Sequence, residues 1–447
     1  MKPFGTGRFG GYLYAADLVA VAALLAWGVA LARGRVTLRG GGFYTPAALY
    51  LGAVFISMVN STDLRRSLTT FPIELYVVAL GLLSYEVVRS AEDLCSVLRA
   101  WMVGAGITAF ANVLGVVLFY AGIRDGRNFA LAVWGSLPQG NYPRVAGLFL
   151  NMNMACNYLS VSLLMLLALR RLDWIGPRAF RSLGLFVVTA SVFTVSPGLG
   201  GILLGAGIWL WALWRRSRPS LALLSLAGGC AAALAFVVAT MISPVNSGGP
   251  GTVFPLLGRR VEASSRLLCW GAAWNAALAR PLSGQGVGVP VECPAWTTPS
   301  GEVQHLSDAH NTYLSIASHD GVLGVLALAA LIAFFLRRSF PLTLDGGELP
   351  VLRTALAIAF IQAFLYQGLA GSWEHSRHLW ILLGLLAAVD GLLRSTRKEA
   401  PPLFPRTPRE VRARPAPRYP CASSSGSGPS DFLLRSRVSV VLRSRRT

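Results

Sequence analysis

The chain has 447 residues, of which 54% are hydrophobic and only 13% are charged. A soluble domain typically has about 25% charged residues. Together with a mean hydropathy of +0.54, this composition excludes a soluble globular enzyme and a disordered chain, and it indicates many membrane spans. The formal charge of +20 does not indicate a nucleic-acid partner, because the basic residues stand between apolar runs.

Apolar segments close to the length of about 20 residues that crosses a bilayer recur along the chain. In chain order they cover residues 18–32, 45–60, 71–88, 100–122, 145–169, 182–214, 220–243, 311–336, 354–373 and 379–393. Segment 182–214 is broken by Ser196-Pro197-Gly198, which predicts two short helices meeting at a turn. Gly201 and Gly205 form a GxxxG pattern that predicts a helix-packing face. The sequence therefore predicts an all-α polytopic membrane protein with about 11–12 transmembrane helices.

The basic residues predict an orientation, because cytoplasmic loops are rich in Lys and Arg. Alternation from the C-terminal end places segments 33–44, 89–99, 170–181, 215–218, 337–353 and 394–447 inside. It places a long loop of about residues 244–310, with short helices, on the exoplasmic side. Eleven spans with a cytoplasmic C-terminus put the N-terminus outside, without a signal peptide to carry it there. We therefore expect either one more span than counted or a true start upstream.

Two regions are expected from this pattern. Residues 1–393 form a helical membrane domain, and residues 394–447 form a basic, disordered cytoplasmic tail rich in Pro, Ser and Arg. The tail either contacts anionic lipid headgroups or is simply solvated.

Motifs for cofactors and metals are weak or absent in the sequence. Gly5-Thr-Gly-Arg-Phe-Gly10 matches GxGxxG but lacks the βαβ context that gives the pattern meaning. The chain has no P-loop, no HExxH, no DxD and no CxxC pair, so no cofactor is expected. Cys269 and Cys293 share the long outside loop, where a disulfide is permitted.

Polar groups gather at the predicted outer face, close to apolar boundaries. The candidate site residues are His310, Arg266, Arg144, Asn311, Arg259, Arg260, Asn153, Glu374 and Arg377. Any single arginine here is equally well explained as an interfacial anchor. As a set, they suit a phosphate anion, because guanidinium groups bind phosphate oxygens bidentately, and a histidine suits proton removal from a hydroxyl.

Three motifs carry a family resemblance. His310-Asn311 is followed after nine residues by Gly321 and after two more by Gly324, with Asp320 before the first glycine. Upstream stand Arg266-Leu-Leu-Cys-Trp270 and Pro281-Leu-Ser-Gly284-Gln-Gly286. Earlier still, Arg144 begins an Arg-x-x-Gly-x-Phe-x-Asn-x-Asn segment that ends at Asn153. Over residues 140–390 the chain resembles the bacterial O-antigen ligase and polymerase superfamily (Wzy/WaaL type). It departs from that family in reading Ser196-Pro197-Gly198 where members often have Ser-Arg-Gly, and in its odd span count.

The resemblance implies a GT-C-like helical fold in the bacterial inner membrane, with the active site on the periplasmic side. It implies inverting, metal-independent transfer of a glycan from a polyprenyl-diphosphate carrier to a hydroxyl of lipid A–core, another lipid-linked glycan or a protein. Arg266 and Arg144 would hold the departing diphosphate, and His310 would orient or deprotonate the acceptor. Asn311 would steady the imidazole or a sugar, or would simply begin the helix. Glu374 and Arg377 are second-rank candidates.

Two other functions compete with glycan transfer. A solute transporter of the same broad superfamily would place its charges near the bilayer midplane and would often show inverted repeats, whereas the polar residues here lie at the predicted outer face. A non-catalytic membrane scaffold would make His310 dispensable. The partners expected for the transferase are the lipid-linked donor, the acceptor and membrane lipids, with no nucleic acid.

Overall fold

The computed structural model describes residues 15–136, 139–149, 151–244, 254–256, 259–297, 303–304, 308–371 and 376–399. The chain divides into two units, residues 1–402 and 403–447, and all the described residues belong to the first. The protein is an all-α polytopic membrane protein, as its composition predicts, and its few strands are short. Helix α12 continues to Glu399, past the expected start of the tail, and the rest of that tail lies outside the described residues.

The helices carry the apolar segments. They are α1 Ala15–Ala32, α2 Tyr44–Val59, α3 Leu64–Val87, α4 Ala91–Tyr120, α5 Met152–Arg171, α6 Pro177–Val192, α7 Gly198–Trp214, α8 Pro219–Met241, α9 Ser265–Ala279, α10 Thr312–Ser339, α11 Glu348–Ala359 and α12 Arg377–Glu399, with a π-helix η1 Phe360–Tyr366 and a 3-10 helix η2 Gln367–Leu369 between the last two. Among the described residues, seven helices are long and apolar enough to cross a membrane, and α1, α2 and α7 are apolar but shorter. The break predicted within segment 182–214 is confirmed, because α6 and α7 separate at residues 193–197.

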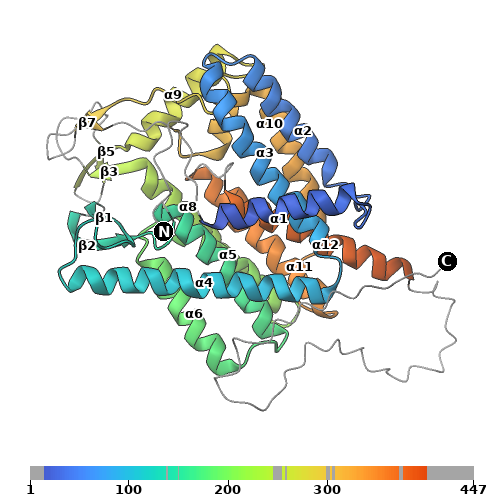
Figure 1. The fold of residues 1–447 in the computed structure, drawn as a ribbon. Helices are drawn as coiled ribbons and strands as arrows, with labels where there is room; N and C mark the ends of the chain where they lie inside the picture. The colour runs from blue at the N-terminus through green and yellow to red at the C-terminus, as the bar shows by residue number, and fades with distance from the viewer. Residues whose placement is uncertain are drawn as a thin grey trace. The chain divides into compact units, whose positions relative to one another are not determined.

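Close helix contacts depend on small residues. Helices α2, α3 and α10 run side by side, with α12 packed on α3 (Figure 1). A Cβ atom on Gly384 of α12 would lie 2.2 Å from the carbonyl oxygen of Gly81 in α3, so this crossing requires glycine. A Cβ on Gly201 would lie 2.6 Å from the amide nitrogen of Gln367. The packing face predicted from the GxxxG pattern is thereby confirmed.

Several of the basic segments expected inside meet at one end of the bundle. Arg171, the last residue of α5, and Arg216, which follows α7, both face Asp345, at 3.8 and 3.4 Å. Arg338, near the end of α10, pairs with Asp390 of α12 at 3.3 Å. Helix ends that the predicted in–out alternation of the spans assigns to one side therefore do lie together. Which side of the membrane they lie on stays a prediction.

The long loop after α8 holds one helix, α9, and short antiparallel strands in its described part. The strands of the protein are β1 Leu131–Ser136, β2 Gln139–Val145, β3 Ile242–Pro244, β4 Phe254–Leu256, β5 Arg259–Ala263, β6 Trp296–Thr297 and β7 Val303–Gln304. Sheet order is β1-β2, β3-β5-β4 and β6-β7. Cys269 of α9 forms a disulfide with Cys293, so the bridge that the sequence permits is present.

Helix α10 is interrupted at Gly321, where the backbone adopts φ 62° and ψ −157°. The Pro281–Gly286 segment docks on this break: the backbone N–H of Gly286 donates to the carbonyl of His319 at 3.0 Å. A Cβ on Gly284 would lie 2.2 Å from that same carbonyl oxygen. The glycines of two separate family-like motifs therefore pack against each other, and their role is structural.

Candidate active site

Arg144 lies near the end of β2, and its side chain is buried. Its Nη2 donates a hydrogen bond to the carbonyl of Val195, in the break between α6 and α7, at 2.9 Å. Burial lowers the pKa of Arg144, but an arginine remains protonated in proteins because its ordinary pKa exceeds 12. A positive charge is therefore fixed beside the Ser196-Pro197-Gly198 turn, although no arginine lies in the turn itself.

Asn153 joins the same turn from the first turn of α5. Its side-chain oxygen accepts a hydrogen bond from the Ser196 hydroxyl at 2.8 Å, and that hydroxyl in turn accepts the backbone N–H of Gly198 at 3.1 Å. Together with residues of η1 and η2, these groups line a small pocket that also reaches Ala370. The Arg-x-x-Gly-x-Phe-x-Asn-x-Asn segment thus brings both its arginine and its last asparagine to one place.

Arg266 approaches this pocket from α9, the helix in the long loop after α8. Ser264 caps the helix by accepting the backbone N–H of Leu267 at 3.4 Å. The Nη1 of Arg266 donates to the carbonyl of Ala370 at 3.1 Å, and Ala370 lines the pocket. Burial lowers the pKa of Arg266, the charge of Arg144 lowers it further, and Asp308 opposes the shift. Two guanidinium groups therefore lie near each other, and the bond to Ala370 uses one of the five N–H donors of Arg266.

His310 stands immediately before α10 in a left-handed backbone conformation, with φ 46°, which is uncommon outside glycine. The carboxylate of Asp308 accepts the backbone N–H of His310 and lies 3.3 Å from its Nδ1. Burial lowers the pKa of His310 below its ordinary value of 6.5; Asp308 opposes this, and the charge of Arg266 adds to it. The imidazole is therefore neutral at neutral pH and able to accept a proton.

Residues 369–371 connect the separate segments. Asn311 donates from Nδ2 to the carbonyl of Leu369 at 3.3 Å, and Thr312 donates from its backbone N–H and its hydroxyl to Gly371 at 3.0 and 2.9 Å. The carbonyl between them, that of Ala370, holds Arg266. Asn311 also caps the N-terminus of α10, since its side-chain oxygen accepts the backbone N–H groups of Tyr313 and Leu314. This agrees with the interpretation of Asn311 as a helix-start residue.

Helix α9 also holds the His310 segment from the other side. Trp270 donates its indole N–H to the carbonyl of Ala309 at 3.0 Å. One residue earlier, Cys269 is linked to Cys293. The family-like Arg266-Leu-Leu-Cys-Trp270 run therefore places a cation and clamps the backbone next to His310.

The other candidate residues do not join this group in the described part of the chain. Arg377 makes a bidentate ion pair with Asp17 of α1, with its Nη2 at 2.9 Å from the carboxylate. Arg259 and Arg260 lie in β5, and their side chains lie outside the described residues, as does all of Glu374.

A buried polar network behind the pocket was not found from the sequence. Asn157 of α5 donates to Gln367 at 3.1 Å and bonds His378 Nε2 at 2.8 Å, while Ser160 accepts from the side-chain amides of Gln362 and Gln367 at 3.1 Å. Polar residues inside apolar spans are themselves a functional signal, and attention to that signal would have identified Asn157 and Gln362.

Comparison with known proteins agrees with this geometry. A family model described as O-Antigen ligase matches residues 182–329, which include Arg266, His310 and both glycines of the α10 motif. No curated protein and no solved structure matches the chain. The match, which covers less than half of the chain, supports the resemblance to the O-antigen ligase and polymerase superfamily.

Proposed function

We propose that this protein transfers a glycan from a polyprenyl-diphosphate carrier to an acceptor hydroxyl on lipid A–core, another lipid-linked glycan or a protein. The observation that carries the proposal is the convergence of Arg144, Arg266 and His310. Arg144 bonds the carbonyl of Val195, next to the turn that lines the pocket, and Arg266 bonds the carbonyl of Ala370, which also lines it. Trp270, on the same helix as Arg266, bonds the carbonyl of the residue before His310. Such a set of two cations and one neutral base is what diphosphate departure and hydroxyl activation require.

The chemistry assigns a role to each group. The acceptor oxygen attacks the anomeric carbon from the face opposite the diphosphate, the new C–O bond forms as the sugar–phosphate bond breaks, and the configuration inverts. Arg144 and Arg266 stabilise the negative charge that develops on the leaving diphosphate. With Nδ1 directed at Asp308, Nε2 of His310 is the nitrogen left to take the acceptor proton. A diphosphate is already a good leaving group, so the proposed step needs no metal.

The same arrangement supports a proposed orientation in the membrane. The site lies at the end of the bundle away from the Asp345 and Asp390 ion pairs, and the positive-inside tendency assigns those basic ends to the cytoplasm. We therefore place the site at the periplasmic face of the bacterial inner membrane and the C-terminal tail in the cytoplasm. The disulfide beside the site is compatible with an oxidising compartment.

Complementation tests the proposal. The gene is deleted and restored with wild type, His310→Ala or Arg266→Ala at matched membrane levels, and surface glycans are resolved on a gel. Arg280→Gln is the matched control, because it removes an exposed arginine of the same loop that bonds the carbonyl of Asn60, away from the pocket.

We expect the control to restore the glycan ladder and both site variants to fail. Free acceptor with long lipid-linked glycan would identify a ligase, and single repeats would identify a polymerase. Site variants that restore the ladder would refute the site assignment. A deletion that leaves every glycan unchanged would instead favour the transporter.

A further inference from the structure

A second pocket lies at the opposite end of the bundle, among the helix ends with basic residues. It has a volume of about 330 Å³ and is lined by Gly40, Gly41, Gly42, Phe43, Tyr85, Phe334, Arg338, Ala387, Asp390, Gly391, Arg394 and Ser395. One water needs only about 10–15 Å³ of cavity volume on the same measure. The pocket therefore has room for a polar headgroup rather than for a single ion.

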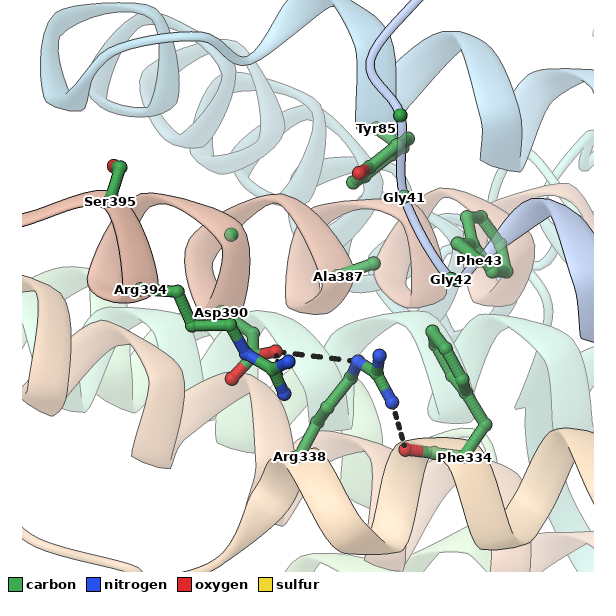
Figure 2. Close-up of a pocket in the computed structure, with 12 residues that line it drawn as sticks. Gly41, Gly42, Phe43, Tyr85, Phe334, Arg338, Ala387, Asp390, Arg394 and Ser395 are labelled. Carbon is green, nitrogen blue, oxygen red and sulfur yellow. Dashed lines mark hydrogen bonds and ion pairs between the residues drawn. The ribbon is translucent and has the colours of Figure 1, made fainter. Parts of the chain in front are cut away.

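The charges in the pocket do not balance. Arg338 and Arg394 share one carboxylate, that of Asp390, at 3.3 and 2.9 Å. Figure 2 shows the Arg338 side chain directed toward Asp390 and Arg394, beside the Gly41–Phe43 segment. These three groups carry one net positive charge, and the guanidinium of Arg39 lies 5.5 Å from the ring centre of Tyr85 in the pocket wall. The pocket is therefore electrostatically suited to an anion.

The guanidinium of Arg338 is held in place before any ligand binds. Its Nη1 donates to the carbonyl of Phe334 at 3.2 Å, and its Cζ lies 3.4 Å from the centre of the Phe334 ring. Because the group is already ordered, an anion that binds here loses less free energy to side-chain ordering. A guanidinium also matches the geometry of phosphate oxygens.

Glycines bring the main chain up to the pocket wall. A Cβ on Gly41 would lie 2.0 Å from the Tyr85 hydroxyl, and one on Gly42 would lie 3.0 Å from Nη2 of Arg338. Side chains at these positions would displace the groups that form the wall. Their absence allows the backbone with its amide groups to lie directly beside the arginines.

The position of the pocket indicates which anions can reach it. It lies where α2 begins, where α10 ends and along the last turns of α12, and all three helices are apolar. The ends of membrane helices lie at the level of lipid headgroups. Phe340, 53% exposed, follows Arg338 by two residues and offers an apolar surface next to the charge. We propose that this pocket binds the phosphate of an anionic phospholipid headgroup, independently of glycan transfer.

Two variants test the pocket without disturbing the candidate active site. Arg394→Gln removes the more exposed of the two cations and leaves the Arg338–Asp390 pair in place. Gly391→Leu fills the pocket, since a Cβ at Gly391 meets no atom within 4 Å, and leucine suits a helix better than glycine. Arg178→Gln is the control, because it removes an exposed basic residue from segment 170–181 of the predicted inside, outside the pocket.

The full chain is purified in mild detergent and incubated with phosphatidylglycerol or phosphatidylcholine, and bound lipid is measured by native mass spectrometry. We expect several-fold more phosphatidylglycerol than phosphatidylcholine on the wild type, and a several-fold loss of the former in both pocket variants only. Equal losses in Arg178→Gln would mean general surface attraction and would overturn the proposal. Stabilisation against heat by inorganic phosphate in the wild type but not in Gly391→Leu, with no lipid retained, would assign the pocket to a soluble phosphate instead.

Discussion

Replacing Gly321 with alanine is expected to destabilise the junction on which α10 and the loop before it depend. The backbone at Gly321, with φ 62° and ψ −157°, lies in a region that only glycine adopts readily, and another residue there costs about 2 kcal/mol. A Cβ would also lie 2.5 Å from the carbonyl oxygen of Leu282 and 2.7 Å from the backbone nitrogen of Gly284. Because both are main-chain atoms, no side-chain rotation relieves the clash, and the docked segment must move.

Movement of the Pro281–Gly286 segment would break its hydrogen bonds to α10. Four backbone bonds join it to α10, from residues 322, 323, 285 and 286 to the carbonyls of residues 281, 282, 318 and 319, at 2.8 to 3.3 Å. At about 1 kcal/mol each, the loss of two of them adds about 2 kcal/mol to the backbone cost. The total of about 4 kcal/mol is a large part of the stability of a folded protein.

The apparent unfolding temperature of purified protein in detergent checks this reasoning. We expect Gly321→Ala to unfold several degrees below wild type and to lose activity with its fold, whereas His310→Ala should lose activity and keep its unfolding temperature. Gly271→Ala is the matched control, because a Cβ on that α9 glycine meets no atom within 4 Å. An unfolding temperature for Gly321→Ala equal to that of wild type would refute the docked geometry.

Three further predictions concern the site. Burial lowers the pKa of His310 below 6.5, and Asp308 opposes the shift, so the rate of transfer measured in vitro should fall only below about pH 6.5. Asp308→Asn should move this loss of rate to lower pH. A loss of rate at higher pH in the variant would contradict the assignment. Removing the disulfide by Cys269→Ser with Cys293→Ser opens a loop with a separation of 24 residues and should cost roughly 3 kcal/mol, seen as a lower unfolding temperature that reductant reproduces only in the wild type. Asn311→Ala loses both the helix cap, worth about 1 kcal/mol, and the Nδ2 bond to the Leu369 carbonyl, worth about 1 kcal/mol. Asn311→Asp loses only the second of these and should unfold between wild type and Asn311→Ala; equal unfolding temperatures for the two variants would show that capping is unimportant.

Local signals in the sequence predicted the parts of the fold that local physics determines. Apolar length located helices, of which seven in the described residues are long and apolar enough to cross a membrane, fewer than the 11–12 spans expected. The proline and glycine at residues 197 and 198 located the break between α6 and α7. The relation of Arg144, Arg266 and His310 was predictable only through the family-like order of motifs. Composition and periodicity report which residues lie near an end of a helix, but they do not report which ends meet.

Contacts between distant segments were beyond such reasoning. The Asn157–His378 bond joins residues 221 positions apart, and the docking of Pro281–Gly286 on α10 depends on tertiary packing. The cation pattern is an instructive case. The turn has Pro197 where the family often has an arginine, and the sequence alone did not show that Arg144, from another family-like motif, bonds the carbonyl of Val195, two residues before Pro197.

The ion pair of Arg377 with Asp17 gives the last test, because it separates a structural arginine from one that acts on substrate. The Asp17 side chain is only 4% exposed, whereas Arg377 is 33% exposed, and Tyr76 also donates to Asp17 at 2.8 Å. Arg377→Gln removes a bidentate cation from a buried carboxylate, which should cost about 3 kcal/mol and lower the unfolding temperature. Adding Asp17→Asn removes that charge, so the double variant should regain both stability and glycan transfer. A double variant that regains stability without transfer would instead place Arg377 among the groups that bind the diphosphate.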